Sequence, residues 1–261
     1  VLAEQTAAQR VPLNISLFGQ TLFHSSMTVE PYVMGVDGVN SFHGLEVNPQ
    51  LDPYGYQYNM GRRQGVERVL GDTLADRKRT YYERGYARVH DRALRYVDRV
   101  EKALSGAREF QALPSTAGKG KPLIRALRTV ARMIDQRRAL SMSRQIFFVS
   151  LGGFDTHDNQ LVDHPKLLAE LSSSVKAFFD AMAEIGMSEQ VTLFTQSDFA
   201  RTLTSNGDGS DHAWGGTQMV IGGAVRGGQI YGDYPVLEMG GALEIGGGIM
   251  AGALAYRLFI W

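Results

Sequence analysis

The chain has 261 residues, of which 44% are hydrophobic, and it carries 27 basic and 27 acidic side chains, so its formal net charge is zero. This length allows one large domain or two small ones, and the balanced charge excludes a global field that attracts nucleic acid or an anionic membrane. The absence of cysteine excludes disulfides and thiolate metal ligands, and no apolar run approaches the roughly 20 residues that cross a bilayer.

The first 105 residues are predicted to contain one strand and one long helix. Residues 11–18 alternate apolar and polar side chains after Pro12, the pattern of a half-buried strand. Residues 19–70 hold scattered glycine, proline, asparagine and tyrosine, and we expect loops with short elements there. Residues 72–105 predict a long amphipathic helix, whose apolar stripe comprises Tyr82, Tyr86, Val89, Ala93, Val97, Val100 and Leu104.

The other face of this helix is charged, with Arg84, Arg88, Arg92, Arg95 and Arg99 interleaved with Glu83, Asp91 and Asp98. A stripe of arginines could bind nucleic acid, but interleaved acids favour a solvated face that forms ion pairs along the helix. We therefore expect no nucleic-acid partner.

A strand–helix–strand unit is predicted in the middle of the chain. It follows an exposed loop or linker at 106–121 and a helix that begins near Pro122. The unit comprises a buried strand at 145–151, a helix from His164-Pro165 to Gly186, and a second strand at 191–195. A connection of this length makes a right-handed crossover between parallel strands, so the carboxyl ends of both strands share one edge of the sheet.

The last 60 residues are less regular. Residues 203–217 predict a polar, glycine-rich loop, and residues 219–221 a third strand. The glycines match no phosphate-binding pattern, so we expect no nucleotide. Residues 239–261 form an atypical tail, which is first rich in glycine and then apolar. It ends on apolar residues with no polar tail, the pattern of an interrupted core element. Because Val1 is not an initiator methionine, we expect a processed or partial product.

Carboxylates, imidazoles and an arginine that could form a site lie in three short motifs. These motifs are GGFDTH (152–157), SDFART (197–202) and SDHAWG (210–215). Asp155 and His157 lie two residues apart, so in an extended segment their side chains point the same way and can share one divalent cation. Taken alone, the pair is a weak signal and is better explained by a loop in which Asp155 caps a turn and His157 bonds the backbone. Asp198 follows the next strand, where it can join the same site or cap a helix.

Arg201 can clamp an anionic oxygen or pair with Asp198 or Asp211. His212 and Trp214 lie in the glycine-rich loop beside Asp211, and each of them has an ordinary structural explanation as well. Two acids, two histidines and one arginine after consecutive strands together favour a site for a metal, an anion or both. No residue is marked as a nucleophile.

These motifs resemble a bacterial family known as domain of unknown function 1501. The resemblance covers roughly residues 10–237 and rests on residues 144–157 (RQIFFVSLGGFDTH), SDFART, residues 209–216 (GSDHAWGG), 221–228 (IGGAVRGG) and 230–232 (IYG). That family looks like a branch of the alkaline-phosphatase and sulfatase superfamily. The resemblance implies an α/β fold in which helices sandwich a mostly parallel central sheet.

The resemblance also implies export, often with a twin-arginine signal, to the periplasm, the cell surface or the medium. In the superfamily a two-metal centre lies at the carboxyl edge of the sheet, which implies Asp155, His157, Asp198 and His212 as metal ligands. Arg201, Asp211 and Trp214 are then implied as substrate-binding residues. The family's opening strand, its Gly-Gly-x-Asp segment and its Ser-His-Phe motif, which would supply a first metal ligand and a nucleophile, are missing here. We therefore expect one partial domain over 1–261.

Two functions remain open from the sequence. The first is a hydrolase of phosphate or sulfate esters that depends on a divalent metal, with zinc, calcium or manganese as the cofactor. The second is a non-catalytic cell-surface or assembly component that reuses the fold. The first has a small anionic ester as its partner, the second another protein.

Overall fold

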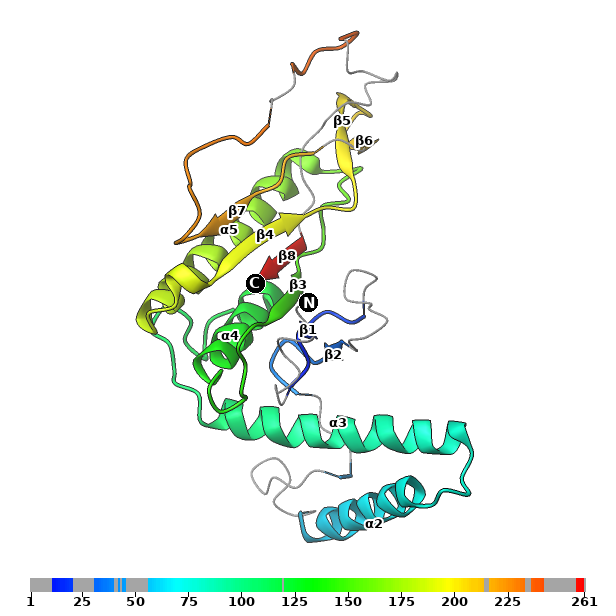
Figure 1. Ribbon diagram of the computed structural model, residues 1–261. Helices are drawn as coiled ribbons and strands as arrows, with labels where there is room; N and C mark the ends of the chain where they lie inside the picture. Colours follow the sequence, from blue (N-terminus) through cyan, green and yellow to red (C-terminus); the bar gives the residue numbers. More distant parts are fainter. Residues whose placement is uncertain are drawn as a thin grey trace.

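A computed structural model describes residues 11–20, 31–39, 42, 44–45, 56–118, 120–213, 216–232, 236–241 and 257–260. The helices are α2 (Tyr56–Ala75), α3 (Tyr81–Ser105), α4 (Pro122–Asp135), α5 (Gln160–Glu184) and the short 3-10 helix η2 (Ser188–Gln190). The strands are β1 (Asn14–Ser16), β2 (Tyr32–Val33), β3 (Ile146–Ser150), β4 (Thr192–Gln196), β5 (Ala200–Ser205), β6 (Ser210–Ala213), β7 (Val220–Gly222) and β8 (Arg257–Ile260). Figure 1 shows the mixed α/β arrangement that they form.

Six strands form one mixed sheet in the order β2-β1-β3-β8-β4-β7. The β2, β1 and β3 strands pair in parallel, whereas β8 pairs antiparallel with both β3 and β4, and β7 pairs antiparallel with β4. The β3 and β4 strands therefore run in the same direction, as predicted. The prediction of a mostly parallel sheet is wrong, because an apolar strand from the unexplained tail pairs with both of them from the opposite direction.

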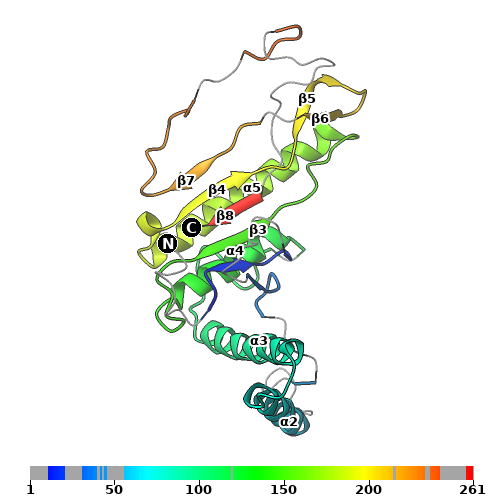
Figure 2. The same ribbon diagram turned by 45° about the vertical axis from the view of Figure 1, so that its right-hand side comes forward.

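Helices α4 and α5 pack side by side against one face of the sheet (Figures 1 and 2). The core lies between them and the sheet, and its fully buried side chains include Leu127, Val130, Phe147, Phe178 and Leu193. The predicted sandwich, with helices on both faces, is not seen among the described residues. Instead, α2 and α3 turn back on each other beside the sheet (Figure 2), and the C-terminal part of α3 packs against α4.

The long helix predicted over 72–105 is two helices, because α2 ends at Ala75 and α3 begins after Thr80. The Thr80 hydroxyl accepts a hydrogen bond from the Glu83 N–H while the Glu83 carboxylate accepts one from the Thr80 N–H. This reciprocal cap satisfies two backbone donors and fixes the start of α3.

Helix α2 also occupies 56–70, where loops were predicted. Its first two buried positions are polar, since Asn59 and Arg63 are buried, and the Arg63 guanidinium donates to the Asp98 carboxylate of α3 at 2.6 Å. Only its second half buries an apolar side chain, Leu70, with Val66 and Leu74 packed around the same cluster. An apolar stripe that covers only half of a helix is a weak signal for the whole element.

Only the C-terminal half of the predicted α3 stripe is buried. Val97, Val100 and Leu104 lie in the core, whereas the side chains of Tyr82, Tyr86 and Val89 are exposed. The charged face forms ion pairs as predicted, among them Asp91–Arg95 at 2.8 Å. Within the described residues, no helix has the length and apolar character needed to span a bilayer.

Helix α5 begins at Gln160, about one turn before the predicted start, so Pro165 lies inside the helix. The Gln160 N–H donates to the Asp208 carbonyl, and the Asn159 N–H donates to the Asp208 carboxylate, so a distant turn caps this helix. The predicted stop is confirmed. Gly186 adopts a left-handed conformation (φ +65), and the following Met187 N–H donates to the Met182 carbonyl.

The segment predicted as a glycine-rich loop contains a hairpin. Strands β5 and β6 pair antiparallel and extend beyond the end of β4 (Figure 1). Asp208 lies in the turn between them, so the same turn that caps α5 carries β6 across to the loop that follows β3. The fold thereby brings the first and third sequence motifs together.

Candidate metal centre

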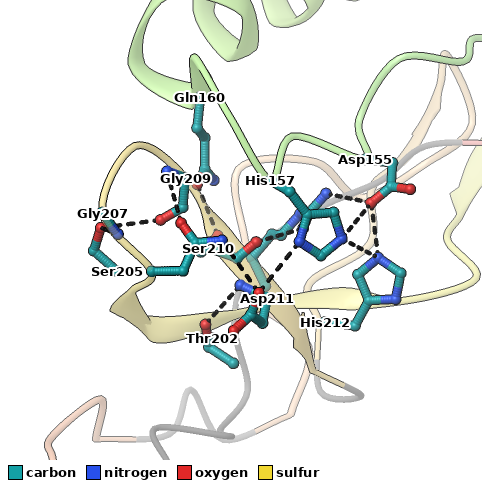
Figure 3. Close-up of polar contacts among 12 residues, drawn as sticks. Asp155, His157, Gln160, Thr202, Ser205, Gly207, Gly209, Ser210, Asp211 and His212 are labelled. Carbon is teal, nitrogen blue, oxygen red and sulfur yellow. Dashed lines mark hydrogen bonds and ion pairs between the residues drawn. The ribbon is translucent and has the colours of Figure 1, made fainter.

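Three side chains from two distant segments converge on one point. The Asp155 Oδ1 atom lies 3.0 Å from the His157 Nε2 atom and 2.8 Å from the His212 Nε2 atom, and the two Nε2 atoms are 3.2 Å apart (Figure 3). One ligand atom from each residue lies within 4.8 Å of the other two. This set of three, called here the metal group, is able to hold a metal ion.

The metal group begins in the extended segment after β3. The side chains of Asp155 and His157 are 59% and 44% exposed, whereas Thr156 between them is 5% exposed. The alternation confirms the prediction that these two side chains point the same way.

The third member of the metal group, His212, lies on β6, and Gly209 allows this strand to approach the first motif. A Cβ atom built on Gly209 would lie 2.3 Å from the His157 carbonyl oxygen and 2.4 Å from the Thr156 carbonyl oxygen. Only glycine lets the turn lie so close to the backbone of the first motif. Gly209 has no predicted role in the sequence, where the available signal is a glycine directly before the Ser-Asp-His triplet.

Arg201 links the two segments from inside the protein, since its side chain is only 4% exposed. Its guanidinium donates to the Phe154 carbonyl at 2.8 Å, to the Ser210 carbonyl at 2.7 Å and to Asp155 Oδ1 at 3.0 Å. The prediction that Arg201 binds a substrate oxygen does not fit this placement, because its donors already hold protein oxygens. Arg201 is a positioning residue for Asp155.

The electrostatics of the metal group favour an ionised Asp155. The hydrogen bond from His212 holds the pKa of the Asp155 carboxyl below its ordinary value, and the hydrogen bond from Arg201 and the charges of both histidines act in the same direction. Metal binding requires the ionised carboxylate that this shift favours, and it also requires loss of the proton that His212 donates to Asp155.

Asp211 holds the other nitrogen of His157. Its Oδ1 atom lies 3.2 Å from the His157 Nδ1 atom and also accepts a hydrogen bond from the Asn206 amide at 3.2 Å. When Nδ1–H of the neutral ring donates to this carboxylate, Nε2 carries the lone pair that a metal ion would bind. Asp211 was predicted to bind substrate, whereas its contacts are those of a residue that orients the His157 ring.

Phe199 supports His212 and was missed by the sequence analysis. The two rings stack with their centroids 4.1 Å apart and their planes 14° from parallel, and the Arg201 guanidinium carbon lies 5.1 Å from the Phe199 centroid. An aromatic side chain between Asp198 and Ala200 in the SDFART motif was the available signal. The stack limits how the His212 ring can turn.

The remaining predicted site residues are placed differently. Asp198, predicted as a fourth ligand, is exposed in the turn between β4 and β5 and lies outside the metal group. Trp214 falls outside the residues that the structure describes.

The spacing of the metal group fits a small divalent ion. A tetrahedral zinc ion with bonds of roughly 2.0–2.1 Å separates its ligands from one another by about 3.3 Å. The three separations between the ligand atoms of the metal group, 2.8, 3.0 and 3.2 Å, are close to that value. All three side chains are 44–59% exposed, so solvent reaches the position between them.

The metal group and its supporting residues fall within a stretch that a known family shares. The family model described as "Protein of unknown function (DUF1501)" matches residues 40–244. The chain belongs to this family. No curated protein and no solved structure matches the chain. The DUF1501 match confirms the family predicted from the motifs and contains all of them, from the strand before Asp155 to the glycine-rich segment after His212.

Proposed function

We propose that the metal group binds one divalent ion and that the protein hydrolyses phosphate or sulfate esters with its help. The observation that carries this proposal is the convergence of the Asp155 Oδ1 atom and two imidazole Nε2 atoms within hydrogen-bonding distance of one another. Three protein ligands with an exposed remaining position are typical of catalytic sites, whereas structural zinc sites are closed by four protein ligands.

The donor set favours zinc, followed by manganese. Two imidazole nitrogens and one carboxylate oxygen suit ions of borderline hardness, whereas calcium takes six or more oxygen ligands. Among the three ions expected from the sequence, zinc therefore fits best, and calcium fits least.

The charges around the metal group favour an anionic ligand once the ion is bound. Asp155, Asp211 and the Arg201 guanidinium together carry one net negative charge when both histidines are neutral, so the group attracts a cation. A divalent ion changes this balance to one net positive charge. The loaded group therefore attracts an anionic oxygen, such as that of a phosphate or sulfate ester.

Each supporting residue has a defined task in this proposal. A bound divalent ion would supply Lewis-acid chemistry and would lower the pKa of water. Asp211 keeps the His157 Nδ1–H in place, so that Nε2 remains an acceptor. Arg201 fixes the orientation of the Asp155 carboxylate, and the Phe199 ring limits rotation of His212.

The resemblance of the motifs to the alkaline-phosphatase and sulfatase superfamily supports this reaction class. The same resemblance supports export to the periplasm, the cell surface or the medium. The family membership by itself assigns no activity, so the reaction must be tested directly.

The test is hydrolysis of p-nitrophenyl phosphate and p-nitrophenyl sulfate by protein loaded in turn with zinc and manganese. We expect release of p-nitrophenol that chelator abolishes and the metal restores. His212→Ala should lose this activity. His90→Ala should retain it, because His90 lies on α3, where its Nδ1 atom contacts the Tyr86 carbonyl. Metal binding without hydrolysis of either ester would contradict the hydrolase and favour a non-catalytic component.

A further inference from the structure

A cavity lies at the end of the sheet where β3 and β4 begin. Its volume is about 710 Å³, and its lining includes Gln145 and Phe147 at the start of β3 and Thr192 at the start of β4. The residues that follow α4 form one wall, and the turn between α5 and β4 forms another. The metal group lies beyond the opposite ends of the same two strands.

The lining of this cavity is positively charged. Arg137, Arg138 and Arg144 contribute to it, and no aspartate or glutamate lines it among the residues that the structure describes. Three nearby carboxylates have contacts elsewhere. Asp135 pairs with Arg108, Glu184 accepts the N–H groups of Gln111 and Ala112, and Glu189 lies against Gly223. Within the described part of the chain, Arg137 and Arg138 form no ion pair with these three acids, and the Arg137 Nη1 atom donates to the Ile134 carbonyl at 3.1 Å.

A compact turn holds the first two arginines. The Leu140 N–H donates to the Gln136 carbonyl, and the Met142 N–H donates to the Arg137 carbonyl at 2.7 Å. Ser141 between them adopts a left-handed conformation (φ 54), which is uncommon for a residue other than glycine. The turn fixes the backbone from which Arg137 and Arg138 extend, so less conformational entropy is lost when they meet an anion.

The rest of the lining combines apolar side chains with the polar side chains of Ser143, Gln145, Gln190 and Thr192. Phe147 is buried at this surface, and the other apolar members are Ile134, Met142, Met187 and Val191. Gln145 is 8% exposed, and its Nε2 atom donates to the Pro12 carbonyl. Its Oε1 atom is buried and has no hydrogen-bond partner among the described residues. A ligand that fits this lining has an anionic head and an apolar body.

We infer that this cavity binds a small organic anion, with a phosphonate, phosphate or carboxylate head on an apolar body. Arginine guanidinium groups bind such oxyanions through paired N–H donors. The volume lies within the range of sites for small molecules. This site does not depend on the metal group or on the proposed hydrolysis.

The probe is benzenephosphonate, because ester hydrolysis cannot cleave its carbon–phosphorus bond. Binding is measured by calorimetric titration of the 261-residue chain in EDTA, so that the metal group holds no ion. We expect saturable binding that weakens as salt is added. Inorganic phosphate and benzyl alcohol, which supply the head and the body separately, should each bind more weakly. Benzoate should show whether a carboxylate head is preferred to a phosphonate head.

The variants test the position of the site. Arg138→Gln should weaken benzenephosphonate binding by about tenfold, because a hydrogen bond to a charged group is lost, and adding Arg137→Gln should weaken it further. Arg138 is exposed, so the fold should persist, and thermal unfolding checks this. Arg68→Gln, an exposed arginine on α2, is the matched control and should bind as wild type.

Three outcomes would overturn the inference. Equal binding by the arginine variants and wild type would place the probe elsewhere, as would loss of binding in His212→Ala. Inorganic phosphate that binds as tightly as benzenephosphonate would remove the role of the apolar lining.

Discussion

Replacing Asp211 tests whether the metal group is organised as the contacts indicate. The Asp211 carboxylate is the partner of the His157 Nδ1 atom, at 3.2 Å, and its side chain is 64% exposed. Carboxylates that orient a ligating histidine change metal affinity by roughly 10–100-fold. Because this contact is long and exposed, we expect Asp211→Asn to weaken zinc binding by the lower limit of this range, about tenfold or 1.4 kcal/mol. Asp211→Ala removes the acceptor as well and should lose more.

The assay is a competition titration of zinc against a chromophoric chelator, at a pH where both histidines of the wild type bind. Asp158→Asn is the matched control, because Asp158 is exposed beside the same histidine and its removal changes the charge equally. If Asp158→Asn loses as much affinity as Asp211→Asn, the effect is general electrostatics. If Asp211→Ala binds zinc as tightly as wild type, the assigned role of Asp211 is refuted.

Three further predictions concern the framework of the site. Gly209→Ala should destabilise the protein by roughly 1–3 kcal/mol in chemical denaturation and should weaken zinc binding, because the added Cβ would overlap the His157 carbonyl. The control is Gly61→Ala in α2, where the added Cβ meets open space and should stabilise the protein. Thr80→Ala should cost about 1 kcal/mol by removing the cap of α3, and a Thr80→Ser variant that keeps its stability is the control. The hydrogen bond from Arg125 holds the pKa of Asp37 below its ordinary value. This pair should therefore add stability above the unfolded pKa of about 3.9, and that stability should be lost as pH falls through the lower folded pKa. Arg125→Gln should flatten the acid side of the plot of unfolding free energy against pH, and an unchanged plot would contradict the assignment.

The central strands and their crossover could be predicted because apolar patterning decides them. The run that became β3 is apolar throughout, and the stripe of α5 repeats at helical spacing, so both elements are visible without tertiary information. Their order placed Asp155 and His157 at a sheet edge. Helix α2 could not be predicted, because its first buried positions, Asn59 and Arg63, are polar and the Arg63 charge is paired by Asp98 of a distant helix.

The supporting residues of the metal group could not be predicted for a different reason. The contacts of Arg201 with Asp155 and of Asp211 with His157 join residues 46 and 54 positions apart. They depend on a β5–β6 hairpin whose strands are short and largely polar, and which is docked through Gly209 and the cap at Asp208. Residue type alone was enough to select these residues as candidates. The position of the hairpin shows that Arg201 and Asp211 orient Asp155 and His157, whereas the sequence predicted that they bind substrate.

The metal content of the purified protein tests the central claim most directly. Protein equilibrated with zinc, then freed of unbound metal, is measured by native mass spectrometry beside Asp155→Ala, His212→Ala and His90→Ala. The metal group predicts one tightly bound zinc ion in wild type and in His90→Ala, and loss of that ion in the other two variants. Equal zinc content in all four proteins, or none in any of them, would contradict the assignment of Asp155, His157 and His212 as metal ligands.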